Sequence, residues 1–301
     1  MNTRFLTPGL VMAIALVVGP AAGEDAWPRT YKDAKGHTVT LPGKPARIAS
    51  LTLGTDENLL DLVAPERLVA MTSIAKEPYV SNVAGRVPEA ACLVTKELQA
   101  VKDLRPDLVL VATYTKELTE PLVAAGLPVY QFSEFHGLET LLRNLEILGQ
   151  LTGEEAKADA LLQECRARLA RAAEKAKSRA GAEKPVRAIY YSEGRLAGAG
   201  TTPSDVLCAA GAVDACADFG ISGTVEATSR LIANLHPDVI FIGEDTAEAE
   251  AATRALFAST PYQEIPAAKD GRVLAIPGKH ITTVSYHIVE AVEDVQRLLG
   301  W

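Results

Sequence analysis

Motifs for catalysis and metal binding are scarce in this chain of 301 residues. The sequence has no Gly-x-Ser-x-Gly elbow, no His-Glu-x-x-His pair and no glycine loop of the kind that binds phosphates. It has five histidines but no His-rich loop, and four cysteines but no Cys-x-x-Cys motif. Glu193 and Glu244 could form a carboxylate pair, but carboxylates at loop ends are usually solvated. We therefore expect no enzyme, no catalytic residue and no metal or cofactor held by the protein itself.

An excess of basic residues is also lacking, since 30 Lys and Arg stand against 38 Asp and Glu. Residues 1–23 are typical of a cleaved signal peptide, with Arg4 before an apolar run over 10–18 and small residues Ala21 and Gly23 after it. The run is too short to span a bilayer, so we expect no membrane span in the mature chain. No cysteine stands directly after this run, so a lipid anchor is not indicated. Removal of Arg4 leaves a net charge of −9, which argues against a nucleic-acid partner.

All four cysteines lie in the predicted mature chain, and export to an oxidising compartment permits disulfides. Cys208 and Cys216 bracket a short segment and could pair. Cys92 and Cys165 could pair only if the fold brings them together. Buried free thiols are an equally good interpretation.

A long helix is the most regular feature of the sequence. Thr152 stands three residues before Glu155, which is the spacing of a capping box at a helix start. Apolar residues then recur at helical spacing as far as the stop at Ala180-Gly181. About 26 residues at 1.5 Å each make a rod of roughly 39 Å. We predict this helix over residues 152–180.

The chains on either side of this helix resemble each other. Leu-x-Pro-Asp occurs at 104–107 and again at 235–238, and each copy is followed by an unbroken apolar run. Such runs suit parallel strands that are buried on both faces. The sequence therefore predicts an α/β fold of two Rossmann-like lobes with parallel sheets, over residues 24–151 and 181–301, joined by the one long interlobe helix.

Several motifs occur together in a recognisable order. They are the signal peptide, the strand Arg-Ile-Ala-Ser-Leu at 47–51, the acid-bearing loop after it, the two Leu-x-Pro-Asp strands and the long capped helix. Residues 207–214 add a helix-end motif in which Asp214 stands where Asn is usual. In combination, residues 45–299 resemble the periplasmic substrate-binding proteins of ABC importers for iron-siderophores, haem and vitamin B12.

This resemblance implies a periplasmic, monomeric solute-binding protein with a stiff interlobe helix and small hinge motion. It would capture a metal chelate (a corrinoid, an iron-siderophore or haem) in the interlobe cleft and deliver it to an ABC permease and ATPase complex. The iron or cobalt would belong to the ligand. Alternatives are a zinc- or manganese-binding importer protein, and a binding module or enzyme of similar fold without a transporter.

Candidate ligand contacts are loop residues at the carboxyl ends of the predicted strands, where open parallel sheets bind ligands. Aromatic rings among them could stack on a planar ligand, although partly buried packing explains them nearly as well. Tyr79 and His280 are the candidates for touching an iron atom in haem. The loops lack an arginine cluster, which favours a neutral or weakly charged ligand such as a corrinoid. The predicted contacts are Thr52, Thr55, Tyr79, Asn82, Thr113, Tyr114, Tyr191, Thr201, Thr202, Glu244, His280 and Tyr286.

The resemblance also implies one outward acid residue in each lobe, placed to contact arginines of the permease. Glu57 matches the first of these positions. The second matching position holds Arg230, which has the wrong charge. Glu226, one helical turn earlier, is the predicted substitute, and solvated surface charge is the alternative for both glutamates.

Overall fold

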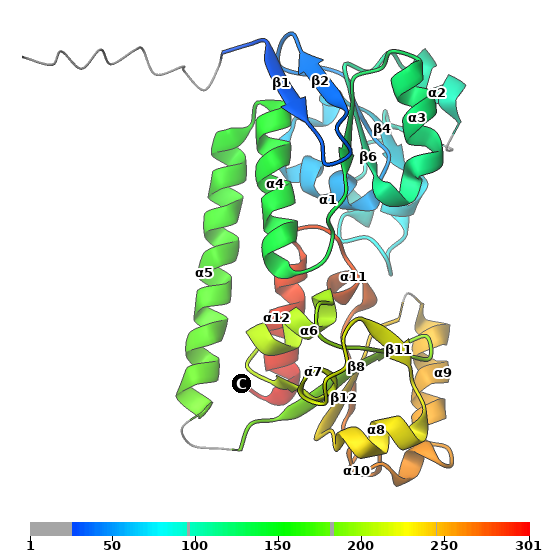
Figure 1. Cartoon of the computed structure of the whole chain (residues 1–301), viewed down its shortest axis with the longest axis vertical. Helices are drawn as coiled ribbons and strands as arrows, with labels where there is room; N and C mark the ends of the chain where they lie inside the picture. Colours follow the sequence, from blue (N-terminus) through cyan, green and yellow to red (C-terminus); the bar gives the residue numbers. More distant parts are fainter. Residues whose placement is uncertain (1–25, 95–96, 181–183, 245) are drawn as a thin grey trace, which may run out of the picture.

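The computed structural model of the chain describes residues 26–94, 97–180, 184–244 and 246–301 (Figure 1). The predicted signal peptide over 1–23 lies outside these described residues. Among the helices that are described, none is long and apolar enough to cross a membrane.

The first lobe is built on a parallel sheet of five strands, preceded by a small hairpin. Its strands occur in the order β5-β4-β3-β6-β7, so the neighbours β3 and β6 are not consecutive in the chain. Helices cover the sheet because both of its faces are apolar. The strands are β1 (Arg29–Lys32), β2 (Thr38–Leu41), β3 (Ile48–Ser50), β4 (Leu68–Thr72), β5 (Cys92–Val94), β6 (Leu108–Ala112) and β7 (Val129–Phe132), and the helices are α1 (Leu53–Leu62), α2 (Leu98–Asp103), α3 (Lys116–Ala124) and α4 (Leu138–Thr152).

The second lobe contains a sheet of six strands in the order β11-β9-β8-β12-β13, with β10 paired to β8. This sheet is mixed, so the prediction of a parallel sheet is wrong for β9 and β11, which are antiparallel to their neighbours. The reason is a tight hairpin turn after β8, where Glu193 and Gly194 both have positive φ, at 48° and 76°. The strands are β8 (Arg187–Ser192), β9 (Arg195–Ala197), β10 (Val213–Asp214), β11 (Thr224–Glu226), β12 (Val239–Ile242) and β13 (Val273–Ala275), and the helices are α6 (Thr202–Ala209), α7 (Ala215–Asp218), α8 (Ser229–Leu235), α9 (Ala247–Phe257), α10 (Pro266–Lys269), α11 (Gly278–Ile281) and α12 (Ile288–Leu299).

The Leu-x-Pro-Asp repeat has the same local structure in both lobes. The residue before each proline, Arg105 or His236, has a φ of 47° in the left-handed region. The aspartate after each proline accepts a backbone N–H at the start of the neighbouring strand: Asp107 from Arg47, just before β3, and Asp238 from Arg187, the first residue of β8, each at 2.8 Å. The motif therefore joins each central apolar strand, β6 or β12, to the strand beside it.

The interlobe helix α5 (Glu155–Ala180) begins later than predicted. Thr152 is the last residue of α4, where its hydroxyl donates to the carbonyl of Leu148 at 2.7 Å, so the predicted capping box is wrong. Gly153 ends α4 in the left-handed conformation, with a φ of 69°. The chain then reverses, and α5 packs first on α4 and then on α12 along the long axis of the molecule (Figure 1).

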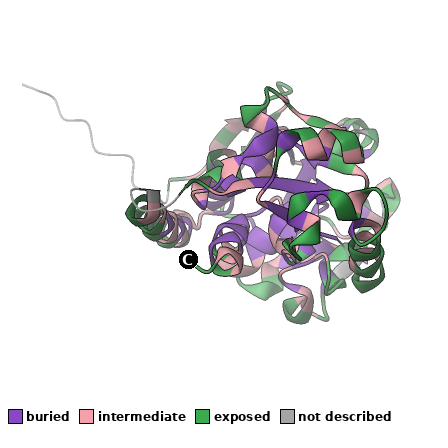
Figure 2. Cartoon of the chain, turned by 90° about the horizontal axis from the view of Figure 1, so that it is seen from below, coloured by how far each residue is buried: buried purple, intermediate pink, exposed green. Residues whose placement is uncertain are grey.

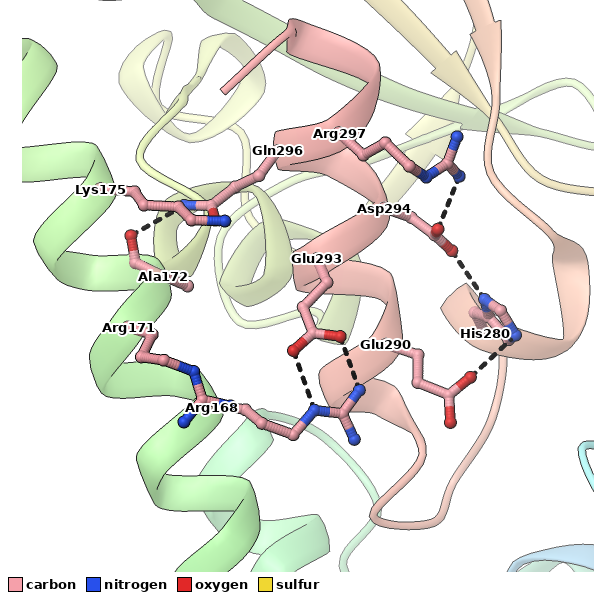
Figure 3. Close-up of a pocket in the computed structure, with 10 residues that line it drawn as sticks. All are labelled: Arg168, Arg171, Ala172, Lys175, His280, Glu290, Glu293, Asp294, Gln296 and Arg297. Atoms are coloured by element: carbon pink, nitrogen blue, oxygen red, sulfur yellow. Dashed lines mark hydrogen bonds and ion pairs between the residues drawn. The ribbon is translucent and has the colours of Figure 1, made fainter.

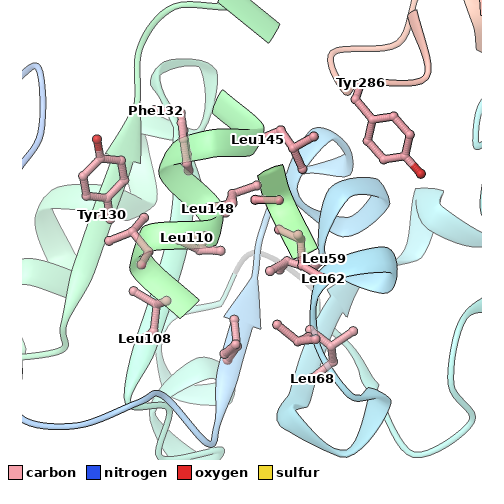
Figure 4. Packing of buried hydrophobic residues seen from close by; sticks show 14 of the residues in the cluster. Leu59, Leu62, Leu68, Leu108, Leu110, Tyr130, Phe132, Leu145, Leu148 and Tyr286 are labelled. Atoms are coloured by element: carbon pink, nitrogen blue, oxygen red, sulfur yellow. The ribbon is translucent and has the colours of Figure 1, made fainter. Parts of the chain in front are cut away.

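Each lobe completes its core with residues from elsewhere in the chain. The core of the first lobe includes Tyr286 (Figure 4) and Val289, which come from the C-terminal segment. The core of the second lobe includes Leu141 of α4 and Ala172 of α5. Buried residues therefore fill the interior across both lobes, with exposed residues at the periphery (Figure 2). The lobes are joined by shared packing as well as by α5.

Of the two interpretations left open for the cysteines, the structure favours free thiols over disulfides. Cys165, Cys208 and Cys216 are free, so neither Cys208–Cys216 nor Cys92–Cys165 is paired. Cys208 is exposed on α6, whereas Cys216 is buried in the core beside β8. The side chain of Cys92 lies outside what the structure describes.

Candidate functional site

A cavity of about 560 Å³ lies between the lobes. Its walls come from the loops after β6 and β7 in the first lobe, from the β8–β9 hairpin and the start of α6 in the second, and from the segment between α11 and α12. This is the position at the carboxyl ends of parallel strands where α/β proteins bind ligands. The lining residues are Thr113, Tyr114, Ser133, Phe135, His136, Tyr190, Ser192, Glu193, Arg195, Ala197, Thr201, Thr202, Pro203, Thr224, Ile281, Thr282, Thr283 and Val284.

Hydroxyl groups dominate the polar chemistry of this lining. Ten of its residues are serine, threonine or tyrosine. Among the described residues of the lining, Arg195 and Glu193 are the single cation and the single anion, so their charges balance. Arg195 also donates to the carbonyl of Thr224 at 2.9 Å, which uses part of its capacity within the protein. The cavity is therefore suited to a ligand that offers many hydrogen bonds and little net charge.

Two aromatic rings form one side of the cavity. The ring centroids of Tyr114 and Phe135 are 5.4 Å apart and their planes are tilted by 52°. Tyr114 is 57% exposed, and its hydroxyl is hydrogen-bonded to that of the buried Thr52. His136 follows Phe135 and is also exposed at the cavity. A flat hydrophobic ligand surface would contact these rings.

The predicted ligand contacts divide into two groups in the structure. Thr113, Tyr114, Thr201 and Thr202 are brought together in the cavity lining. The others lie elsewhere. Thr52 and Thr55 are buried at the start of α1, and Tyr79 is 55% exposed outside the lining.

The remaining predicted contacts are engaged in packing or internal hydrogen bonds. Tyr191 is buried, and its ring centroid lies 5.0 Å from that of Phe257 in an edge-to-face contact. Successive strand residues point to opposite faces of the sheet, so Tyr190 faces the cavity instead. Glu244 is buried and accepts a hydrogen bond from Thr253 at 2.7 Å. Tyr286 is in the core, with its hydroxyl donating to Asp61 at 2.7 Å. For these residues the predicted exposure to the cleft is wrong.

His280 faces a second cavity, of about 510 Å³, between α5 and α12 (Figure 3). Its ring nitrogens lie 3.0 Å from Glu290 and 2.6 Å from Asp294, and Arg168 pairs with Glu293 across the same gap. Burial alone would raise the pKa of Asp294, but hydrogen bonds from His280 and Arg297 hold that pKa below its ordinary value. His280 therefore connects α11 to α12 and does not reach the interlobe cleft. No group of three or more His, Cys, Asp or Glu side chains among the described residues is arranged to hold a metal ion.

The N-terminal half of α1 contains two fully buried acid residues, Asp56 and Glu57, whose burial the sequence did not indicate. Oδ2 of Asp56 accepts the backbone N–H of Thr72 at 3.0 Å, while Oδ1 has no hydrogen-bond partner within the described part of the chain. Burial raises the pKa of Asp56 to about 7, against the hydrogen bonds from Ser50 and Thr72. Acid residues in the first turn of a helix usually face solvent near the helix dipole, and nothing local in the sequence distinguishes these.

The predicted outward position of Glu57 is wrong. Its side chain is 0% exposed and accepts hydrogen bonds from Asn82, Thr283 and Ser285. Glu226 is exposed, but it ends strand β11, and the next helix begins only at Ser229. The helical spacing that was to align Glu226 with Arg230 is therefore absent, and a docking role for Glu226 stays a prediction.

Comparison with known proteins adds four findings. The model of a family described as periplasmic binding protein matches residues 48–279. The chain is 28% identical over 285 residues to a protein of Halobacterium salinarum named cobalamin-binding protein, covering 90% of this chain and 75% of the relative. It is 26% identical over 278 residues to an uncharacterised ABC transporter substrate-binding lipoprotein, YvrC, of Bacillus subtilis, covering 90% and 85%. A solved structure of the periplasmic haem-binding protein RhuT of Roseiflexus sp. RS-1 has the same fold, with a TM-score of 0.70, 21% identity, and coverage of 84% of this chain and 97% of that one.

Proposed function

The chain belongs to the periplasmic binding protein family, and from this we propose that it captures a corrinoid-type metal chelate between its lobes and delivers it to an ABC importer. It acts as a binding protein rather than an enzyme. Its partners are the ligand and the permease and ATPase of the importer. The relatives named for cobalamin binding and for ABC transport support this proposal at the level of whole chains.

The observation that carries the choice of a corrinoid is the chemistry of the interlobe cavity. A corrin ring is surrounded by neutral amide side chains, which both donate and accept hydrogen bonds. Hydroxyl groups can match either role, because a hydroxyl donates one hydrogen bond and accepts two. In this lining the hydroxyls of Tyr190, Thr201, Thr282 and Thr283 already donate within the protein and are left as acceptors, and the other hydroxyl-bearing residues complement them. Anionic catecholates and haem propionates instead favour several arginines, and the lining has Arg195 balanced by Glu193. The cavity volume is within the usual range of small-molecule sites, about 300–1,000 Å³.

Haem is the second candidate ligand, and His136 is the observation that favours it. An imidazole nitrogen can ligate haem iron, and His136 stands at the cavity beside the rings of Tyr114 and Phe135. This role would replace the one that the sequence suggested for Tyr79 and His280. A His136→Ala variant distinguishes the two ligands. If His136 ligates haem iron, the variant should lose the strong change in haem absorption that accompanies binding, whereas binding of a corrinoid should not depend on this ligation.

The proposed location is the periplasm, reached by a signal peptide over residues 1–23 that is cleaved after export. Family membership supports a location outside the cytoplasm. The YvrC relative is named a lipoprotein, but in this chain no cysteine stands directly after the apolar run at 10–18. N-terminal sequencing of the protein purified from its native envelope would test both points.

Calorimetric titration of the mature protein with cyanocobalamin, haemin and a ferric catecholate tests the proposed ligand. We expect cyanocobalamin to bind most tightly. A cyanocobalamin derivative with one side-chain amide hydrolysed to an acid should bind more weakly, and Glu193→Gln should recover part of the loss by removing a like charge from the cavity. Tighter binding of haemin or of the catecholate would overturn the corrinoid proposal.

A further inference from the structure

Glu57 is a buried carboxylate whose oxygens are fully used. One oxygen, Oε1, accepts the backbone N–H of Asn82 at 2.7 Å and its side-chain amide at 3.1 Å. The other, Oε2, accepts the hydroxyls of Thr283 at 2.5 Å and Ser285 at 2.6 Å. This carboxylate therefore joins α1 to a segment more than 200 residues away, as the separations of 226 and 228 positions show.

The segment held by Glu57 is the floor of the interlobe cavity. Residues 281–284 line the cavity, and most of them lie outside regular secondary structure. The first turn of α1 touches the same segment, since a Cβ on Gly54 would lie 2.7 Å from the side chain and 2.8 Å from the carbonyl of Val284. Further along, Asn58 accepts the backbone N–H of Tyr286 at 3.2 Å. One face of α1 thus supports the floor from below.

We propose that Glu57 is a positioning residue for ligand binding, which fixes the position and orientation of the cavity floor at residues 281–284. This role rests on the proposed function, and it replaces the surface role that the sequence suggested for Glu57. A loop without its own hydrogen-bond ladder takes its position from outside contacts, and the side chain of Glu57 supplies two of them. The reach of the side chain matters more than its charge, because the floor hydroxyls can accept hydrogen bonds as well as donate them.

A pair of substitutions separates reach from charge. Glu57→Asp keeps the charge and shortens the side chain, so the floor should lose its support, and cyanocobalamin affinity should fall by roughly 2- to 30-fold, the range for residues that couple to a site without contacting the ligand. Glu57→Gln keeps the reach, with its carbonyl oxygen toward Asn82 and its amide toward the two hydroxyls. It should bind cyanocobalamin within about twofold of the native protein. The reverse order of the two variants would overturn the proposal.

Two controls exclude a general loss of stability. Glu154→Asp shortens another largely buried carboxylate, paired with Arg67 at 2.6 Å far from the cavity, and should leave affinity unchanged even if the protein is less stable. Thr283→Val removes one floor hydroxyl, which is the other partner in the contact with Glu57. The double variant Glu57→Asp with Thr283→Val should lose less affinity for cyanocobalamin than the sum of the losses in the two single variants. Additive losses, or an equal loss of affinity in Glu154→Asp, would contradict a positioning role.

A measurement without ligand keeps this proposal separate from the choice of ligand. Backbone hydrogen exchange of residues 279–287 in the ligand-free protein should be faster in Glu57→Asp than in the native protein or Glu57→Gln. Unchanged exchange in Glu57→Asp would refute the support of the floor by Glu57. Absence of cyanocobalamin binding to the native protein, with the expected exchange result, would instead refute the corrinoid proposal and leave the support of the floor in place.

Discussion

Tyr114 and Tyr79 are almost equally exposed, at 57% and 55%, but only Tyr114 lines the interlobe cavity. The sequence presented them as equivalent loop tyrosines after strands. The difference comes from the surroundings of each ring: Tyr114 lies against Phe135 and is hydrogen-bonded to Thr52, whereas no residue of the loop that contains Tyr79 is in the cavity lining. Exposure alone therefore does not identify a ligand contact.

Substitution of these tyrosines gives a matched pair for ligand binding. Tyr114→Ala should weaken ligand binding by about 0.5–1.5 kcal/mol beyond the lost contact area, as expected for a stacked aromatic ring. Tyr79→Ala removes the same side chain at the same exposure and should leave affinity unchanged. Calorimetry with cyanocobalamin measures both. Equal effects of the two variants would show that the ligand does not stack on Tyr114.

Asp56 makes stability depend on pH in a direction unusual for a carboxylate. Its pKa is about 7 in the folded protein against an ordinary value of 3.8, so the folded state holds the proton more tightly than the unfolded state. The stability associated with this proton is complete below about pH 4 and is lost as the pH rises through 7.

Asp56→Asn should therefore flatten the fall in stability between pH 4 and pH 7, and it should raise the free energy of unfolding at pH 8 by about 2–4 kcal/mol. Urea unfolding across this pH range measures the effect. Asp159→Asn, at an exposed position on α5, is the control and should leave the pH dependence as it is in the native protein. An unchanged pH dependence in the Asp56→Asn protein would mean that Asp56 is ionised throughout this range.

At the scale of elements, the features that sequence predicted are the ones decided locally. The Leu-x-Pro-Asp motif forms its turn from residues within a few positions of one another, and strands β6 and β12 follow it as predicted. The phase of β8 was not predictable, because a strand buried on both faces has no alternation to show whether Tyr190 or Tyr191 faces the cavity. Glu57 was missed for a different reason. Its burial is decided by Thr283 and Ser285, which no local pattern connects to α1.

The contact between α4 and α5 depends on a glycine inside a helix. A Cβ on Gly149 would lie 2.5 Å from the Cβ of Ala158, so the two helices approach too closely for a larger residue. Gly to Ala in a helix interior usually stabilises by about 1 kcal/mol. Here Gly149→Ala should destabilise by about 1–3 kcal/mol through overpacking.

The partner substitution provides the test of this contact. Ala158→Gly reopens the space, so the double variant Gly149→Ala with Ala158→Gly should recover part of the stability that Gly149→Ala loses. Thermal unfolding of the two single variants and the double variant measures the interaction. If the double variant recovers no stability, the loss in Gly149→Ala does not arise from the contact with Ala158.

At the scale of the whole molecule, the lobes are fixed to each other in several places. Helix α5 spans both lobes, Arg168 on α5 pairs with Glu293 on α12 at 2.7 Å, and Glu57 holds the floor segment against the first lobe. Wide hinge closure would have to break packed contacts as well as bend a helix. This arrangement is stiffer than the single long connector that the sequence suggested.

We therefore expect only a small closure when ligand binds. X-ray scattering of the protein with and without cyanocobalamin should give nearly the same radius of gyration. Loosening the joint by Arg168→Ala should leave the ligand-free protein slightly more extended. A large contraction of the native protein on ligand addition would show that the lobes close as separate bodies.

The contribution of Tyr286 and Val289 to the core of the first lobe has a consequence for how the chain matures. That core is incomplete until the last part of the polypeptide has been synthesised, although most of the lobe lies at the other end of the chain. Domains made first usually fold first. In this protein the core of the first lobe can therefore close only after residues 286–289 have been synthesised.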